Sequence, residues 1–419
     1  MVTKKHLHDN EQPFDKAAAI VLTKLRDCVA EIVRSLPGRV TKAADLKKTL
    51  GLDYKLSWKL FRIAQCVNPL AAGIHVPSPV GLRNLLKAAG KTGVPAERLD
   101  ELRQAMGAFD QLVKEHAGDR SSFDAMISVY GECSGAITPN YRRDSFRANT
   151  HIWGMQAKTQ VKCGLFCSRS NPDRIDGALI NGFVHLRRMR ADTRLVISRT
   201  LLTDDLGRAM GGARKPLSEE HESNEGIGLI HEFCSRPLPK LRWITEPDGS
   251  VSGELENTDV GNQGALTVFT GTVMEAAAVR YRSEENWYQE LNAGLYVPCE
   301  SLILDMLIQR DMYEAGVVNP QLALFGELSP GASYPAPARE REMLSVTETP
   351  VYLGKGPAAA ETEDVPRYTE LLHYAFERLG WPQDEFDVYR CRIEYPIIPT
   401  TAALRFTLPE KPDQASNPD

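Results

Sequence analysis

The chain has 419 residues, of which 42% are apolar and 25% are charged, as in an ordinary globular protein. This length predicts two or three domains of roughly 100–200 residues each. No apolar run approaches the ~18 residues of a membrane span, and the start, "MVTKKHLHDNEQPFDK", is too polar for a signal peptide. We therefore expect a cytoplasmic protein without a membrane partner, whose eight scattered Cys residues are buried reduced thiols.

The net charge of −5 conceals a strong asymmetry along the chain. Residues 1–65 carry 13 Lys and Arg against 7 Asp and Glu, and residues 140–215 carry 15 against 6. Residues 216–419 carry 15 against 34 and are strongly acidic. Such asymmetry favours nucleic-acid contact by the basic parts. The alternative is that the Arg-rich segment pairs with the acidic segment inside the fold, and the two interpretations are about equal in weight.

The basic N-terminal part predicts helices. Residues 15–34 have apolar side chains on one side and predict an amphipathic helix. Residues 40–65, "VTKAADLKKTLGLDYKLSWKLFRIAQ", predict two short helices around a tight turn. Thr41 can cap the first of these helices and Asp53 the second, and Gly51 stands where the first must end.

The outer side of the second short helix is cationic. In a helix-turn-helix, the second helix lies in the major groove with its first turns against base edges. Lys and Arg neutralise phosphates or reach guanine acceptors, and Ser can donate or accept. The side chains that we expect to contact DNA are Lys47, Lys48, Lys55, Ser57, Trp58, Lys59 and Arg62.

This segment resembles the helix-turn-helix family of DNA-binding regulators, over about 25 residues. The positions that carry the resemblance are Leu46, Leu50, Gly51, Leu52 and Leu60. The resemblance implies a DNA-binding domain, of the winged-helix type if a hairpin follows, although no clear pair of strands does. Lys47 stands where the family has a small residue, and Ser57 where a branched apolar residue is common. Either the helices cross at a wider angle, or the motif serves packing or dimerisation alone.

Further helices at 80–89 and 96–118 complete a helical domain of residues 15–130, which follows a disordered tail of residues 1–14. The whole chain also resembles long, uncharacterised bacterial proteins with an N-terminal helix-turn-helix. "FRANTHIWGMQAKTQ", "GNQGALTVFTG" and "YPIIPTTAALRF" carry that resemblance, which supplies an architecture but no reaction.

Residues 131–408 predict a larger mixed α+β region. Strands and helices follow one another without regular βαβ spacing, and a helix at 365–380 ends at Gly380. The strand candidates are residues 161–167, 194–202, 265–273, 301–309, 387–395 and 403–408. Residues 328–364 predict a long surface loop, and residues 409–419 a disordered tail. The fold class is thus multidomain, with an all-α helix-turn-helix domain before the α+β region.

An arginine cluster is the second feature of functional interest. Its members are Arg142, Arg143, Arg147, Arg187, Arg188, Arg190, Arg194 and Arg199, and we expect the first six to contact an anion. On a single face they would form a phosphate track or a pocket for an acidic effector. The alternatives are pairing with the acidic remainder of the chain and a solvated surface.

Catalytic signatures are incomplete, so catalytic residues stay unassigned. "HEFCS" lacks the second His of a zinc-protease motif, and Cys163 and Cys167 have no second close pair to complete a zinc site. We expect no metal and no cofactor. The leading hypothesis is a homodimeric DNA-binding transcriptional regulator whose C-terminal region senses a small-molecule effector or mediates dimerisation. The alternatives are an enzyme with its site in residues 140–408 and a protein-interaction scaffold.

Overall fold

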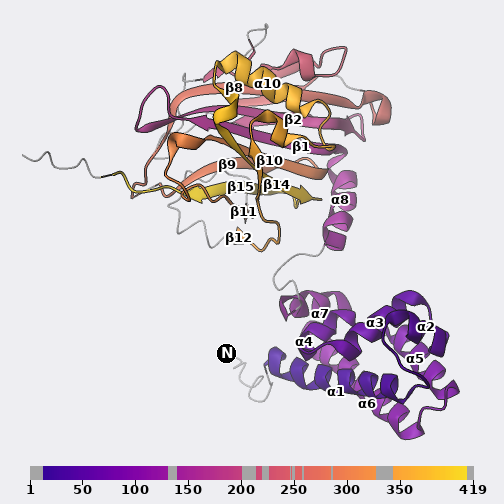
Figure 1. Cartoon of the computed structure of the whole chain (residues 1–419). Coiled ribbons are helices and arrows are strands. Elements are labelled where there is room, and N and C mark those ends of the chain that lie inside the picture. The colour runs from indigo at the N-terminus through magenta and orange to yellow at the C-terminus, as the bar shows by residue number, and fades with distance from the viewer. Residues whose placement is uncertain are drawn as a thin grey trace, which may run out of the picture. The chain divides into compact units, whose positions relative to one another are not determined.

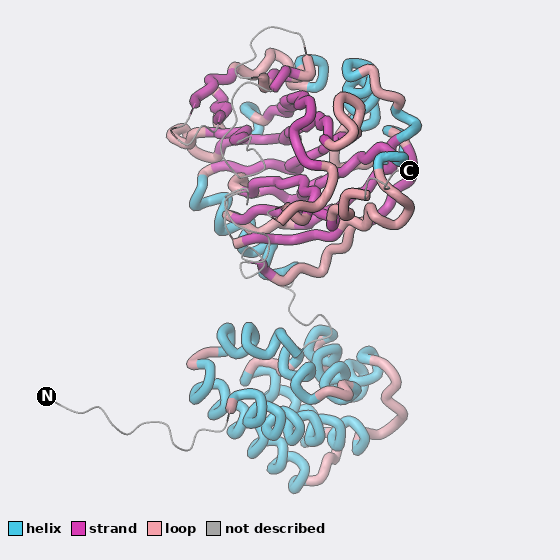
Figure 2. The backbone as a smooth tube through the Cα atoms, turned by 90° about the vertical axis from the view of Figure 1, so that its left-hand side faces the viewer, coloured by secondary structure: helices cyan, strands magenta, loops and turns pink. Residues whose placement is uncertain are grey.

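The computed structural model describes residues 13–130, 139–200, 214–218, 226–245, 247, 251–256, 259–284, 286–326 and 343–412. The chain divides into two compact units, residues 1–136 and 137–419. Helices make up the described part of the first unit, and strands dominate the second (Figure 1, Figure 2). Helices followed by a larger mixed α+β region confirm the predicted fold class at this coarse level. Residues 1–12 and 413–419 of the expected tails lie outside the described residues, and Phe14 belongs to a helix instead of the tail.

The first unit, which we call the helical unit, is a bundle around one apolar core. Its helices are α1 (Phe14–Ser35), α2 (Ala43–Leu50), α3 (Tyr54–Gln65), α4 (Pro69–Ala72), α5 (Pro79–Lys91), α6 (Ala96–Leu112) and α7 (Arg120–Ile127). Single turns are η1 (Gly73–His75), η2 (Val113–Ala117) and η3 (Ser128–Tyr130). The core includes Leu22, Leu60, Leu85, Leu102 and Phe123, each at most 2% exposed. Residues 13–130 contain no strand, so the winged variant of the prediction has no hairpin there.

The turn between α2 and α3 has the geometry that the sequence predicts. Gly51 takes the left-handed conformation (φ 61°, ψ 29°), and its N–H donates to the Lys47 carbonyl at 3.0 Å. The Asp53 carboxylate caps α3 by accepting from the Leu56 N–H at 2.9 Å. The expected cap by Thr41 is wrong. Asp45 lies in the first turn of α2, and its side chain reaches back towards Thr41. The Asp45 carboxylate accepts from the Thr41 N–H at 2.9 Å.

The second unit, the strand unit, is built on one mixed sheet of order β13-β14-β10-β1-β2-β8-β4, with β5 also paired to β8. Strands β1 and β10 are parallel, and the other pairs of this sheet are antiparallel. The strands are β1 (Met155–Cys167), β2 (Arg174–Arg188), β4 (Arg214–Pro216), β5 (Gly228–Leu229), β8 (Leu266–Val279), β10 (Cys299–Gln309), β13 (Val351–Lys355) and β14 (Phe386–Glu394).

Both faces of this sheet are covered. Helix α10 (Tyr368–Leu379) lies across one face (Figure 1), where Leu371 and Phe376 pack on strand residues such as Ile303. On the other face, Leu304 of β10 packs with Leu404 of a second, antiparallel sheet. That sheet contains β9 (Tyr288–Leu295), β11 (Gln321–Phe325), β12 (Met343–Leu344) and β15 (Thr400–Thr407). The result is a layered α+β core, as buried faces require.

Smaller elements surround these layers. A third sheet, of order β3-β7-β6, contains β3 (Leu195–Thr200), β6 (Leu241–Thr245) and β7 (Val251–Leu255). Helix α8 (Pro139–Trp153) leads directly into β1. Single turns are η4 (His231–Phe233), η5 (Gly261–Gly264), η6 (Arg310–Met312), η8 (Pro357–Ala360) and η9 (Gln383–Glu385). No helix in the described chain is long and apolar enough to cross a membrane.

Two expectations for the strand unit need correction. Of the predicted loop 328–364, residues 328–342 lie outside the described residues. Residues 343–364 contain β12, β13 and η8 instead of a loop. Strand β13 forms because it hydrogen-bonds to β14, far away in sequence. Strand β2 escaped prediction because glycines interrupt its pattern. Gly182 is required there, since a Cβ would lie 2.2 Å from the Phe269 ring on the neighbouring strand.

Candidate nucleic-acid interface

The outer side of α3 carries a polar and aromatic stripe. Its members are Tyr54, Lys55, Trp58, Lys59 and Arg62. These positions recur at intervals of three or four residues and therefore share one side of the helix. Trp58 is 42% exposed, Lys55 is exposed, and Lys59 and Arg62 are half-buried. We call this set the α3 stripe.

Ser57 does not belong to the α3 stripe, although the sequence predicted it as a DNA contact. Its side chain is fully buried, and its hydroxyl donates to the Asp53 carbonyl at 2.8 Å. One residue along a helix turns the side chain by about 100°, which places Ser57 on the core side next to the exposed Trp58. A serine can occupy this core position because the carbonyl four residues earlier satisfies its hydroxyl.

Lys47 and Lys48 lie in the last turn of α2 and are exposed. Neither makes an ion pair with the residues that the structure describes. The Lys47 side chain points to solvent, whereas Leu46 and Leu50 are buried and hold α2 against the core. The lysine at the family's small-residue position therefore does not obstruct the packing of α2 and α3.

Positive charge gathers at the middle of α3. Burial lowers the pKa of Lys59, and the positive charges of Arg120 and Lys55 lower it further, against the opposing effect of Asp124. Arg120 lies there because it donates to Asp124 at 2.7 Å and to the Val76 carbonyl at 2.8 Å. One carboxylate thus faces three cations, and an approaching anion would relieve their mutual repulsion.

Trp58 is held in place while it stays half-exposed. Its ring meets His75 of η1 edge to face, with centroids 5.3 Å apart and planes at 86°. The contact fixes the indole at the junction of α3 and η1. An exposed aromatic ring in a fixed position, flanked by cations, suits contact with a base or sugar more than it suits a solvated surface.

The predicted arginine cluster does not assemble into one anion site. Arg142 is only 4% exposed and binds Glu348 with two nitrogens, one of them at 3.1 Å, so the expected phosphate contact is wrong for this residue. The Arg143 guanidinium lies over the Tyr395 ring at 5.1 Å and donates to its hydroxyl. The exposed Arg147 lies 3.4 Å from Asp144 on the same helix.

The other three arginines with an expected anion contact bind near the end of α8 and the β2 terminus. Arg190 donates to the carbonyls of His151 and Ile152 at 3.4 and 3.3 Å. A cation at these last carbonyls stabilises the helix end. Arg188 donates to the Ala191 carbonyl at 3.1 Å, and Arg187 to the Asn262 side chain. These six arginines thus have partners within their own unit, and Arg142 pairs with a carboxylate of the acidic segment.

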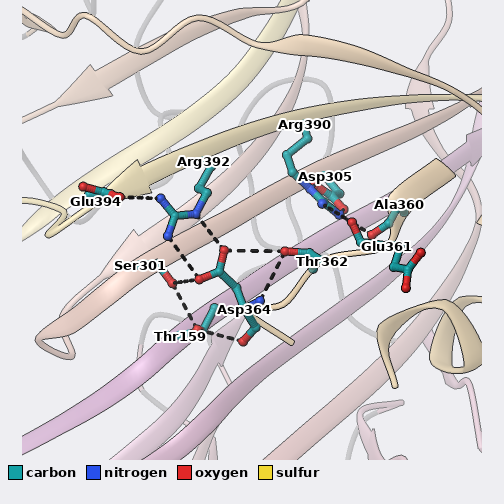
Figure 3. A network of polar contacts seen from close by, with 10 residues as sticks. All are labelled: Thr159, Ser301, Asp305, Ala360, Glu361, Thr362, Asp364, Arg390, Arg392 and Glu394. Atoms are coloured by element: carbon teal, nitrogen blue, oxygen red, sulfur yellow. Dashed lines mark hydrogen bonds and ion pairs between the residues drawn. The ribbon is translucent and has the colours of Figure 1, made fainter. Parts of the chain in front are cut away.

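A polar network under α10 is the first candidate for an active site in the strand unit (Figure 3). Asp305 is fully buried, and both of its oxygens accept from Arg390, at 2.8 and 2.7 Å. Arg390 also donates to the carbonyls of Ala360 and Glu361, at 2.7 and 3.2 Å. The pair therefore ties β10 and β14 to the segment that leads into α10.

The outer half of the same network surrounds Asp364. Arg392 donates to it at 2.7 and 3.1 Å and holds the pKa of this carboxyl below its usual value. Ser301 donates to Asp364 at 3.3 Å, and Thr159 and Ser301 lie 3.0 Å apart. Arg392 engages both oxygens of the Asp364 carboxylate that the Ser301 hydroxyl faces. The network holds the α10 segment on the sheet.

Two of the hollows in the described part of the strand unit have charged linings. One of about 600 Å³ is lined by residues including Arg169, Lys215 and Glu275, and the Lys215 ammonium lies 2.7 Å from Glu275. The other, of about 360 Å³, contains Arg194 and Arg242, both within 2.9 Å of the Glu254 carboxylate. Each hollow thus contains an ion pair in its lining.

No protein-family model and no curated protein matches this chain. Among the described residues there is no group of three or more His, Cys, Asp or Glu that could hold a metal ion. The α3 stripe, with the α2 lysines, therefore remains the surface whose chemistry best indicates a partner.

Proposed function

We propose that this protein binds double-stranded DNA by placing the α3 stripe in the major groove, and that it acts as a transcriptional regulator. One observation carries the proposal. Cations and an exposed, immobilised Trp58 share the outer side of the second helix of a two-helix motif whose turn is fixed by Gly51 and Asp53. A helix of this kind reads base edges with its first turns.

The Lys47 and Lys48 side chains complement the stripe. They precede the turn, so they are placed to neutralise phosphates while α3 occupies the groove. One helix-turn-helix makes few base contacts. Helix-turn-helix proteins therefore commonly bind as dimers to two half-sites that lie one helical turn apart. We therefore propose that the protein binds as a homodimer. The strand unit, in the same proposal, mediates dimerisation or senses a small-molecule effector.

The test is a salt titration of DNA affinity with the full-length chain and duplex fragments from its own genomic neighbourhood. Counterion release predicts that log K falls with log salt at about 0.9 per phosphate contact. The Lys55→Ala/Lys59→Ala/Arg62→Ala variant should bind at least tenfold more weakly and lose roughly two to three contacts from that slope.

A matched control removes three cations from other helices. The Arg34→Ala/Arg103→Ala/Lys114→Ala variant has the same charge change, and its residues lie on α1, α6 and η2. It should keep the slope to within about one contact. If the wild-type chain retains no duplex at low salt, or if both variants lose affinity equally, the proposal is wrong.

A further inference from the structure

We infer that α5 forms a second phosphate-binding surface, a basic stripe that contacts the DNA backbone beside the groove that α3 occupies. Its members are Arg83, Lys87 and Lys91, with Val80 and Asn84 between them on the same side of the helix. We call it the α5 stripe. The inference rests on the proposed function, since its partner is the backbone of the same duplex.

The α5 sequence separates its two sides completely. Leu82, Leu85 and Ala89 are at most 2% exposed and pack into the core. The three cations are all exposed, and they recur every four residues, so they lie in one row. The helix "PVGLRNLLKAAGK" contains no Asp or Glu, which leaves the row with a charge of about +3 that its own helix does not offset.

The neighbouring helix α6 shows what an ordinary solvated face looks like in this unit. There Arg98 lies 3.0 Å from Glu101, and Arg103 pairs with Asp100, each one turn away. The three cations of the α5 stripe make no ion pair and no hydrogen bond with the described residues. Unpaired cations in a row repel one another, which raises the electrostatic free energy of the free protein. A row of anions bound beside them would remove this repulsion.

The α5 stripe belongs to the same part of the helical unit as α3. A Cβ at Gly81 would lie 3.2 Å from Leu56 Cδ1, so the first turn of α5 packs closely on the first turn of α3. Helix α5 also packs against α2, which carries Lys47 and Lys48. The three helices that carry these cations, α2, α3 and α5, therefore pack together in one part of the unit.

The length of the stripe fits a DNA strand. Arg83 and Lys91 are eight residues apart, about 12 Å along the helix axis. One strand of B-DNA presents a phosphate about every 3.4 Å along its axis, so the stripe spans three or four phosphates. Lys87 and Lys91 are point charges without the planar fork of arginine, and they suit phosphate contact better than base reading.

The experiment compares the Arg83→Ala/Lys87→Ala/Lys91→Ala variant with wild-type protein in the salt titration described above, on a preferred duplex and on an unrelated duplex of equal length. We expect the slope to fall by about two to three contacts on both duplexes. The ratio of the two affinities should stay within about threefold of the wild-type ratio, because phosphate contacts carry no sequence information. Circular dichroism checks that the helices are retained.

The outcomes separate this inference from the proposed function. If the wild-type chain binds DNA and the α5 variant keeps its full salt slope, the inference is wrong while the role of α3 stands. A variant that loses sequence preference instead of slope also overturns it, since α5 would then read bases. If wild-type protein binds no duplex and the α5 substitutions abolish its self-association, the stripe is a protein contact and both proposals fail.

Discussion

The predicted basic surfaces of the two units lie in opposite environments. In the strand unit, Arg142 binds Glu348, Arg390 binds Asp305, and all six arginines that were expected to contact an anion have partners within that unit. In the helical unit, Lys47, Lys48 and the α5 stripe have no such partner among the residues described. The same residue types are structural in one region and available to a ligand in the other. A basic segment therefore indicates nucleic-acid binding only where its charge is not used within the fold.

The strongest test of this comparison removes one half of the buried pair in the strand unit. Asp305→Asn leaves Arg390 as an uncompensated buried charge and should lower the free energy of unfolding by about 3–5 kcal/mol. Urea denaturation of the full chain, monitored at the unfolding transition of the strand unit, measures this change in the free energy of unfolding. DNA affinity at the helical unit should stay the same under folding conditions.

The double variant Asp305→Leu/Arg390→Met serves as its control, since replacing both partners by apolar groups of similar size can restore stability. If Asp305→Asn is as stable as wild-type protein, the pair is not the structural element that its geometry indicates.

Lys162 is an exception in the strand unit and gives the next largest effect. Its ammonium donates to Asn181 at 2.7 Å and makes no ion pair within the described chain, and burial lowers its pKa from 10.5 to about 8. The unfolded chain therefore binds more protons between pH 8 and 10.5, so stability rises with pH in that window. The Lys162→Met variant should be more stable than wild-type protein at pH 7 by about 2 kcal/mol.

That advantage should shrink as the pH is raised from 8 to 10.5, because wild-type Lys162 then loses its buried charge. Urea denaturation of both proteins at pH 7, 8.5 and 10 measures the difference, and groups that titrate in both proteins cancel. A difference that is independent of pH would contradict the assignment of the low pKa to Lys162.

The smallest expected effect is on the stability of the helical unit when one of its exposed cations is removed. Lys48→Ala should change the free energy of unfolding by no more than about 0.5 kcal/mol, because the side chain contacts solvent. The same variant should lose about one phosphate contact from the salt slope. A large loss of stability would show that Lys48 is used within the fold, as the arginines of the strand unit are.

Local pattern was enough to predict much of the helical unit. The apolar spacing of residues 15–34 and 54–65, the Gly51 stop and the Asp53 cap are all found in the structure. These features depend on interactions within a few residues, which a single sequence contains. The exposure of Lys47, Lys48 and Lys55 follows from the same helical period.

Other residues could not be assigned from local pattern. Ser57 has a polar side chain in a cationic run, yet it is buried because the core of the bundle lies on its side of α3. Arg142 pairs with Glu348, 206 residues away, and no local signal connects them. Strand β2 is continuous because Gly182 accommodates the Phe269 ring of β8, which the sequence of β2 does not reveal.

The sequence by itself determined where α1, α2 and α3 of the first unit lie, the mixed α+β nature of the second, and the total charge of each segment. Only the tertiary structure decided which charges are neutralised. Helix period and caps act over one or two turns, whereas ion pairs and strand partners join residues far apart in the chain. The fold gives the six arginines partners within the strand unit and, among the described residues, leaves Lys47, Lys48 and the α5 stripe without ion pairs.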